Sequence, residues 1–122
     1  MTSNRQVVGA RSTGTLVVEP DGEHATLTFR RFYPHAVEHV WDAISTPEGL
    51  RGWLTCTHAV IDARVGGRMD MISGPTQYRS TGRILAWEPP RVLEYEWNVA
   101  PVPEMPRGER AIRSELIQKG IE

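Results

Sequence analysis

Two histidines and an aspartate in the 122-residue sequence have the spacing that a metal site on one helix would need. His35, His39 and Asp42 stand at i, i+4 and i+7, so two imidazoles and a carboxylate would share one side of a helix. The HExxH pattern of zinc proteases is missing from the sequence, and neighbouring glutamates add nothing diagnostic. We therefore interpret these residues as a solvated helix face and predict neither a metal site nor another cofactor.

A pair of carboxylates raises the question of acid–base catalysis. Glu94 and Glu96 alternate with Leu93, Tyr95 and Trp97, which is the clearest strand pattern in the sequence. Side chains at i and i+2 of a strand share a face, so the glutamates are predicted to point away from the apolar face and into solvent. Exposed carboxylates lack the burial that shifts a catalytic pKa, and no catalytic residue is predicted.

The single cysteine and the glycine pair also lack a chemical context. No cysteine-centred motif surrounds Cys56, which is predicted to be a passive packing residue. Gly66-Gly67 lacks the GxxxxGK[ST] pattern of a phosphate loop and the helix that follows such a loop. The pair therefore indicates a hairpin turn between two strands.

The remaining candidates for function are apolar and aromatic. Met69 and Met71 share one face of a predicted strand, and Tyr95 and Trp97 share one face of another. These side chains either form the core or line a pocket in which a phenol hydroxyl and an indole N–H orient an apolar ligand. The predicted ligand-binding residues are Trp53, Met69, Met71, Tyr78, Tyr95 and Trp97.

The composition argues against several classes of partner. Fourteen Lys and Arg stand against fifteen Asp and Glu, for a formal charge of −1, so no net field attracts nucleic acid or an anionic membrane. The sequence has no signal-peptide pattern at its start and no apolar run of about 18 residues, and a cytoplasmic location is predicted. The length suits one domain, predicted over residues 13–122 after a flexible segment at residues 1–12.

The element that would position these residues is the helical stretch from Tyr33 to Leu54. Its apolar residues recur with helical spacing, and a kink near Ser45 and Thr46 divides it into two short helices, the first with Pro34 in its first turn. Gly49 and Gly52 weaken the second helix. The helical apolar positions are Val37, Val40, Trp41 and Ile44, and Trp41 and Trp53 are predicted to clamp the helices against a sheet.

Strand patterns lie on both sides of the helices. A hairpin is predicted across Pro20-Asp21-Gly22, and further strands at 59–65, 68–72, 77–87 and 91–99. Residues 109–121 carry both a helical pattern, with charge pairs at i,i+4, and a period-two pattern. Local rules favour a helix there.

These landmarks, in this order, resemble the START-like (helix-grip, SRPBCC) superfamily, in the branch of homologues of the activator of the heat-shock-protein-ninety ATPase. The resemblance covers residues 24–99, and it is carried by Val37, Val40, Trp41, Asp42, Ala43, Ile44, Pro47, Glu48, Leu50, Trp53, Asp62, Val65, Gly66, Gly67, Arg68, Met69, Gly82, Arg83, Ile84, Pro89, Pro90, Arg91, Leu93, Tyr95 and Trp97.

The resemblance implies an α+β fold, with an antiparallel curved sheet, a short helix pair after the first strands and an apolar cavity. It makes residues 109–120 a strand, which we adopt over the local helical pattern. The family's last strands and long C-terminal helix have no counterpart before Glu122, so the domain is predicted to be incomplete at its C-terminus. The uncovered face would expose on the order of several hundred Å² of apolar surface. A homodimer, a partner or a missing part of the natural protein is predicted to cover it.

The predicted function is a non-enzymatic binding module. It would hold a small apolar ligand or a protein partner on the concave face of its sheet, in a stress-related or co-chaperone-like setting. The alternatives are a cyclase- or hydrolase-like enzyme, using Tyr78, Tyr95 or Arg83 as acid or electrostatic stabiliser, and a dimerising structural protein.

Overall fold

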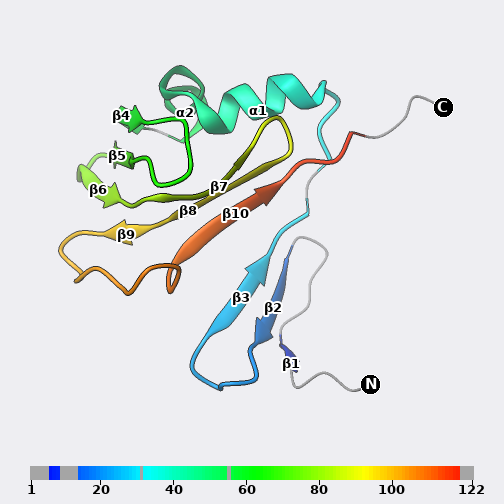
Figure 1. Ribbon diagram of the computed structural model, residues 1–122, viewed down its shortest axis with the longest axis vertical. Helices are drawn as coiled ribbons and strands as arrows, with labels where there is room; N and C mark the ends of the chain where they lie inside the picture. Colours follow the sequence, from blue (N-terminus) through cyan, green and yellow to red (C-terminus); the bar gives the residue numbers. More distant parts are fainter. Residues whose placement is uncertain (1–5, 9–13, 31, 55, 119–122) are drawn as a thin grey trace. The chain divides into compact units, whose positions relative to one another are not determined.

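The structure is a computed structural model that describes residues 6–8, 14–30, 32–54 and 56–118 (Figure 1). By the density of its internal contacts, the chain divides into two compact units, residues 1–34 and residues 35–122. The helices, the longer sheets and the candidate sites all lie in the second unit.

The first unit contains a three-stranded antiparallel sheet in the order β1-β2-β3, built from β1 (Gln6–Val8), β2 (Thr15–Val18) and β3 (Ala25–Thr28). The predicted hairpin is present. Its turn is held by Asp21, whose carboxylate accepts hydrogen bonds from the backbone N–H groups of Glu23 and His24 at 2.8 and 3.0 Å. The hydrogen bond with the His24 imidazole, 2.6 Å away, is the main reason that the pKa of Asp21 is lowered to about 2. The two backbone hydrogen bonds lower this pKa further.

Strand β1 lies in the segment predicted to be flexible. Its residues Gln6, Val7 and Val8 pair with Val18, Val17 and Leu16 of β2. Three residues are too short for a strand pattern to be visible in the sequence, and it is this pairing that places them in the sheet. Residues 1–5 and 9–13 lie outside the described part.

The second unit begins with the predicted helix pair, α1 (Val37–Ser45) and α2 (Pro47–Trp53). Helix α2 is capped by Thr46, whose hydroxyl accepts from the N–H of Gly49 at 3.0 Å. The Ser45 hydroxyl instead donates to the Trp41 carbonyl at 2.6 Å. The prediction that Pro34 belongs to the first helical turn is wrong, since α1 starts at Val37 after an extended Ala36.

Seven antiparallel strands follow in two sheets, one in the order β4-β5-β6-β9 and one in the order β10-β8-β7 (Figure 1). Their bounds are β4 (Cys56–Ile61), β5 (Met69–Ser73), β6 (Tyr78–Thr81), β7 (Ile84–Glu88), β8 (Val92–Glu96), β9 (Asn98–Val99) and β10 (Ala111–Glu115).

The two sheets arise because two predicted strands each break in the middle. The segment at 77–87 breaks between β6 and β7 at Gly82 and Arg83, and the segment at 91–99 breaks between β8 and β9 at Trp97. At this bend the backbones approach so closely that a side chain on Gly82 would collide with the carbonyl of Glu96. Each long predicted strand therefore contributes to both sheets, and the sheet curves, as the resemblance implied.

Residues 111–115 form a strand, as the family resemblance implied, and the local prediction of a helix is wrong. Strand β10 pairs with β8 from Ala111↔Glu96 to Glu115↔Val92. The charges that suggested helical i,i+4 pairs bond differently, because the Arg113 guanidinium donates to Glu94 on β8 and to Glu115 two residues ahead, both at 2.7 Å. Non-local strand pairing thus overrides a weak helical preference.

The core of the second unit lies between the helix pair and the strands. Leu50, Met69, Ile84 and Leu93 are almost fully inaccessible, and Trp41 packs edge-to-face on Trp87 with ring centroids 5.1 Å apart. The buried apolar residues are Trp41, Leu50, Cys56, Ala59, Met69, Met71, Ile84, Leu93 and Tyr95. Neither helix in the described residues has the length and apolar character needed to span a bilayer.

Of the two predicted clamp residues, only Trp41 lies in this core. Trp53 is 56% exposed, and its indole N–H donates to the Ala43 carbonyl of α1 at 2.7 Å. Trp53 therefore ties the second helix to the first, and the prediction that it clamps the helices against the sheet is wrong.

Candidate functional site

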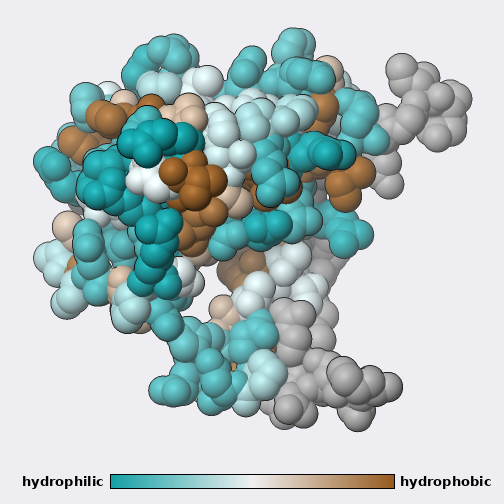
Figure 2. All heavy atoms as spheres, viewed as in Figure 1, coloured by the Kyte–Doolittle hydropathy of each residue, from teal (hydrophilic) through white to brown (hydrophobic). Residues whose placement is uncertain are grey.

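An apolar groove of about 180 Å³ opens between the helix pair and the strands β5, β8 and β10. Its floor is made of core residues, and its rim carries the partly exposed Trp53 and Trp97. The lining residues are Ile44, Leu50, Trp53, Leu54, Met71, Leu93, Tyr95, Trp97, Ile112 and Ser114. In Figure 2 apolar side chains reach the surface in patches between hydrophilic ones.

Four of the six predicted ligand-binding residues line this groove, namely Trp53, Met71, Tyr95 and Trp97. Met69 is 1% exposed and belongs to the core beneath. Tyr78 is 59% exposed on β6 and does not line the groove. The alternation of side chains along the strand correctly placed Met69 on the inward face. It could not show that the neighbouring strands cover this methionine completely.

Tyr95 provides the most distinctive polar group of the groove. Its side chain is 7% exposed, and within the described residues its hydroxyl forms no hydrogen bond. Burial raises the pKa of Tyr95 to about 12, because the phenolate is poorly solvated there. No charged neighbour contributes to the shift, so the phenol stays protonated and able to donate a hydrogen bond at neutral pH.

The raised pKa of Tyr95 predicts alkaline destabilisation. The unfolded phenol ionises near pH 10, whereas the folded phenol keeps its proton to about pH 12, so the unfolded state binds fewer protons in this window. The stabilisation is complete below pH 10 and falls by about 2–3 kcal/mol as the pH rises to 12.

Denaturant unfolding of the wild type and of Tyr95→Phe between pH 9 and 12 measures this loss of stability, which is spread over about two pH units. The wild type should lose stability more steeply than the variant. Parallel slopes would contradict a buried Tyr95.

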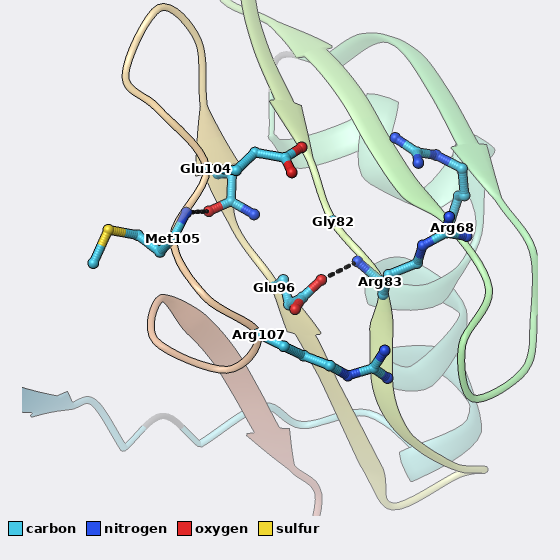
Figure 3. Close-up of a pocket in the computed structure, with 8 residues that line it drawn as sticks. Arg68, Gly82, Arg83, Glu96, Glu104, Met105 and Arg107 are labelled. Carbon is cyan, nitrogen blue, oxygen red and sulfur yellow. Dashed lines mark hydrogen bonds between the residues drawn. The ribbon is translucent and has the colours of Figure 1, made fainter.

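A second, polar cavity of about 310 Å³ lies at the bend between the two sheets (Figure 3). Strand alternation places it across the sheet from the groove, because Tyr95 faces the groove and its neighbour Glu96 lines the cavity. Its lining residues are Arg68, Gly82, Arg83, Glu96, Asn98, Glu104, Met105 and Arg107. No sequence pattern predicted this cavity, because its residues come from four separate segments.

The two glutamates predicted to be solvent-facing differ in their surroundings. Glu94 is partly buried and pairs with Arg113 at 2.7 Å. Glu96 is only 9% exposed, and one of its carboxylate oxygens accepts from the backbone N–H of Arg83 at 2.8 Å. The prediction of exposure is therefore wrong for Glu96, which the bend of the sheet encloses.

Of the two histidines predicted to share a helix face, only His39 lies on α1, because His35 precedes the helix. His35 and His39 are exposed, and no cluster of three or more His, Cys, Asp or Glu suited to a metal occurs among the described residues. Cys56 is buried, and its thiol lies 2.9 Å from the carbonyl of His58. Of the groups considered for an enzyme, Tyr95 lines the groove, Arg83 lines the polar cavity and Tyr78 lines neither.

Comparison with known families agrees with this arrangement of helix pair, curved sheet and groove. The model of the family described as Activator of Hsp90 ATPase homolog 1-like protein matches residues 34–121, most of the chain. The chain belongs to this family. No curated protein matches the sequence closely enough to serve as a relative.

One solved structure supports the fold of this Activator of Hsp90 ATPase homolog 1-like chain. A crystal structure of a protein from Rhodobacter sphaeroides is similar over 93% of this chain and 78% of its own, with a TM-score of 0.57 and 21% identity. The Mll3558 protein from Rhizobium loti covers 70% of this chain and 74% of its own, with a TM-score of 0.47 and 19% identity.

Family membership gives the chain the START-like fold that the sequence motifs implied. The match from residue 34 onward coincides closely with the second compact unit, which contains the helix pair and both candidate sites. At the coarse level, the family suggests a START-like binding module. The lining and the size of the groove are the basis for proposing a ligand.

Proposed function

We propose that the apolar groove of this Activator of Hsp90 ATPase homolog 1-like domain binds a small apolar ligand carrying one polar group. The supporting observation is the combination of an apolar lining with the Tyr95 hydroxyl, which has no hydrogen-bond partner within the described residues and is accessible to a ligand. Pockets of this kind use many apolar contacts for affinity and a few polar groups for orientation.

The size of the groove limits the ligand. An apolar cavity of about 150 Å³ accepts benzene in a well-studied case. The groove here is about 180 Å³ and open on one side, which suits a ligand of one or two rings or a short alkyl chain. Larger lipids would extend beyond the groove, along the exposed rings of Trp53 and Trp97.

The surroundings of Tyr95 favour binding over catalysis. Its pKa is raised by burial alone, with no charged partner, and moves away from neutral pH. Tyr78 and Arg83, the other groups considered for an enzyme, do not line the groove. A hydrogen bond from Tyr95 to the ligand is the role that the groove supports.

1-Naphthol is a suitable probe, because it has two rings and one hydroxyl. We expect it to bind with a dissociation constant of about 10–100 μM, the range that one buried ring system and one hydrogen bond support. Tyr95→Phe should weaken 1-naphthol more than naphthalene, since only the naphthol has a hydroxyl to pair. Chemical-shift titration of the isotope-labelled protein measures both ligands.

Two substitutions on β10 give a matched steric test. Ser114 lines the groove, whereas Ala111 is exposed on the opposite face of the same strand. Ser114→Phe should fill the groove and weaken 1-naphthol about tenfold or more, which corresponds to about 1.4 kcal/mol. Ala111→Phe should leave the affinity unchanged. Undetectable binding to the wild type, or equal binding to both variants, would refute the proposal.

A macromolecule at the same groove is the second proposal, favoured by the exposed rings of Trp53 and Trp97 at the rim. A homodimer would bury these rings against a second copy, and a co-chaperone-like or stress-related role would bury them against another protein. The predicted cytoplasmic location suits either role. Native mass spectrometry separates the cases, since a dimer that dissociates when 1-naphthol binds would identify the groove as the interface.

A further inference from the structure

The polar cavity at the bend of the sheets contains opposite charges that are not paired with one another. Arg68 and Arg83, which pair in an isolated β-bridge next to the strands, line one side. Glu104 and Arg107 reach in from the loop between β9 and β10 (Figure 3). Glu96 lies between the two groups. Within the described residues, no ion pair joins either of these glutamates to any of the three arginines.

Glu96 is held rigidly but is only half satisfied. Its backbone N–H donates to the Arg83 carbonyl at 3.0 Å, and one of its carboxylate oxygens accepts from the Arg83 N–H at 2.8 Å. The second oxygen has no hydrogen-bond partner within the described residues. A carboxylate that is nine-tenths buried and lines a cavity offers this oxygen to a cationic or hydrogen-bond-donating ligand.

The three arginines are not equally available. Arg68 forms two hydrogen bonds with the Asp70 carboxylate at 2.8 and 3.1 Å, which neutralises its charge. Arg83 donates to the Gly66 carbonyl at 3.3 Å, which leaves its charge uncompensated. Arg107 has no hydrogen bond or ion pair within the described residues. Arg83 and Arg107 are therefore the positive groups free to bind an anion.

The loop keeps these charges apart. The side-chain oxygen of Asn98 accepts from the N–H of Met105 at 3.1 Å, and the Trp97 N–H donates to the Arg110 carbonyl at 2.7 Å, so the loop is fixed at both ends. Asn98 is itself buried. The space between the loop and the strands stays open as a cavity of about 310 Å³, rather than closing into an ion pair.

We propose that this cavity binds a small zwitterion with a primary ammonium and a carboxylate. The ammonium would lie against Glu96 and Glu104, and the carboxylate against Arg83 and Arg107. A simple anion is disfavoured because two carboxylates line the same cavity, and a simple cation is disfavoured because two uncompensated arginines do. A molecule with both charges satisfies both sets of groups.

The test uses three probes with the same three-carbon chain and different charged groups. γ-Aminobutyrate carries both charges, whereas butyrate lacks the ammonium and propylammonium lacks the carboxylate. Calorimetric titration at low ionic strength is expected to show γ-aminobutyrate binding at least about tenfold more tightly than either single-charge probe. Equal binding of butyrate would identify an anion site and overturn the proposal. Undetectable binding of γ-aminobutyrate would overturn it as well.

Variants assign the two halves of the site. Arg107→Gln and Glu104→Gln alter exposed loop side chains, so both proteins should fold, and each should weaken γ-aminobutyrate by about fivefold or more. Glu96→Gln keeps an acceptor for the Arg83 N–H and should also weaken it. Arg51→Gln changes an exposed arginine on α2, and as the control it should leave the affinity for γ-aminobutyrate unchanged. Unchanged affinity in Arg107→Gln would overturn the assignment.

The cavity and the apolar groove lie on opposite faces of β8, so their tests are independent. Saturating γ-aminobutyrate should leave the affinity for 1-naphthol unchanged within about twofold. Competition between the two ligands would show that γ-aminobutyrate binds in the groove, and it would overturn the location proposed here. Failure of the groove to bind 1-naphthol has no bearing on the zwitterion site.

Discussion

Trp41→Ala is expected to lower the free energy of unfolding by about 3–5 kcal/mol, the largest single effect we anticipate for a side chain in this protein. Trp41 is 7% exposed and contacts Trp87 edge-to-face at 5.1 Å, with an angle of 68° between the rings. Alanine removes this aromatic contact and leaves a cavity between α1 and the strands that the helix cannot fill by small movements.

Trp53→Ala is the matched control, since it removes the same side chain from the same helix pair. Trp53 is 56% exposed, so its truncation should cost only about 1 kcal/mol, mainly from the lost hydrogen bond to the Ala43 carbonyl. The affinity for 1-naphthol should fall instead. Denaturant unfolding at constant m-value measures the stabilities of both variants. A cost below about 1 kcal/mol for Trp41→Ala would show that its ring does not lie in the core.

Gly49→Ala is expected to destabilise the helix pair by about 1–3 kcal/mol or more, although alanine is the better helix former. A Cβ on Gly49 would collide with the carbonyl oxygen of Asp42 and with backbone atoms of Ala43, so α2 could not keep its position against α1. Backbone atoms cannot rotate away as a side chain can. The helices must separate, and the hydrogen bond from Gly49 to the Thr46 cap would be strained.

Gly52→Ala, three residues further along α2, should have the opposite sign. No atom lies within 4 Å of a Cβ at this exposed position, so alanine adds helix propensity without a collision. We expect a gain of about 0.5–1 kcal/mol. Thermal or denaturant unfolding of the two variants side by side provides the comparison. Destabilisation by both, or by neither, would contradict the observed packing of α2 on α1.

Local sequence rules do not distinguish these two glycines. Propensity treats Gly49 and Gly52 alike, as two residues that weaken one short helix. Only the packed structure distinguishes them, because the contact of Gly49 is with the backbone of α1. Residues 111–115 make the same point, since their charges satisfy a helical spacing and nevertheless pair across two strands.

The sequence by itself determined the elements with a strong local pattern. Helical periodicity predicted the helix pair and its kink, and turn chemistry predicted the hairpin at Asp21 and the turn at Gly66. The order of motifs implied the START-like fold, and the family match agrees with it. These features depend on residues close together in the chain, so a single sequence contains the information.

The tertiary structure alone decided which inward-facing residues are core and which line a site. Strand alternation gives the face of a side chain, but its depth depends on which other segments cover it. Met69 and Met71 are both buried, and only Met71 also lines the groove. For the same reason Glu96, predicted to face solvent, is enclosed where the strands bend and a loop distant in sequence brings Arg107 to the same cavity.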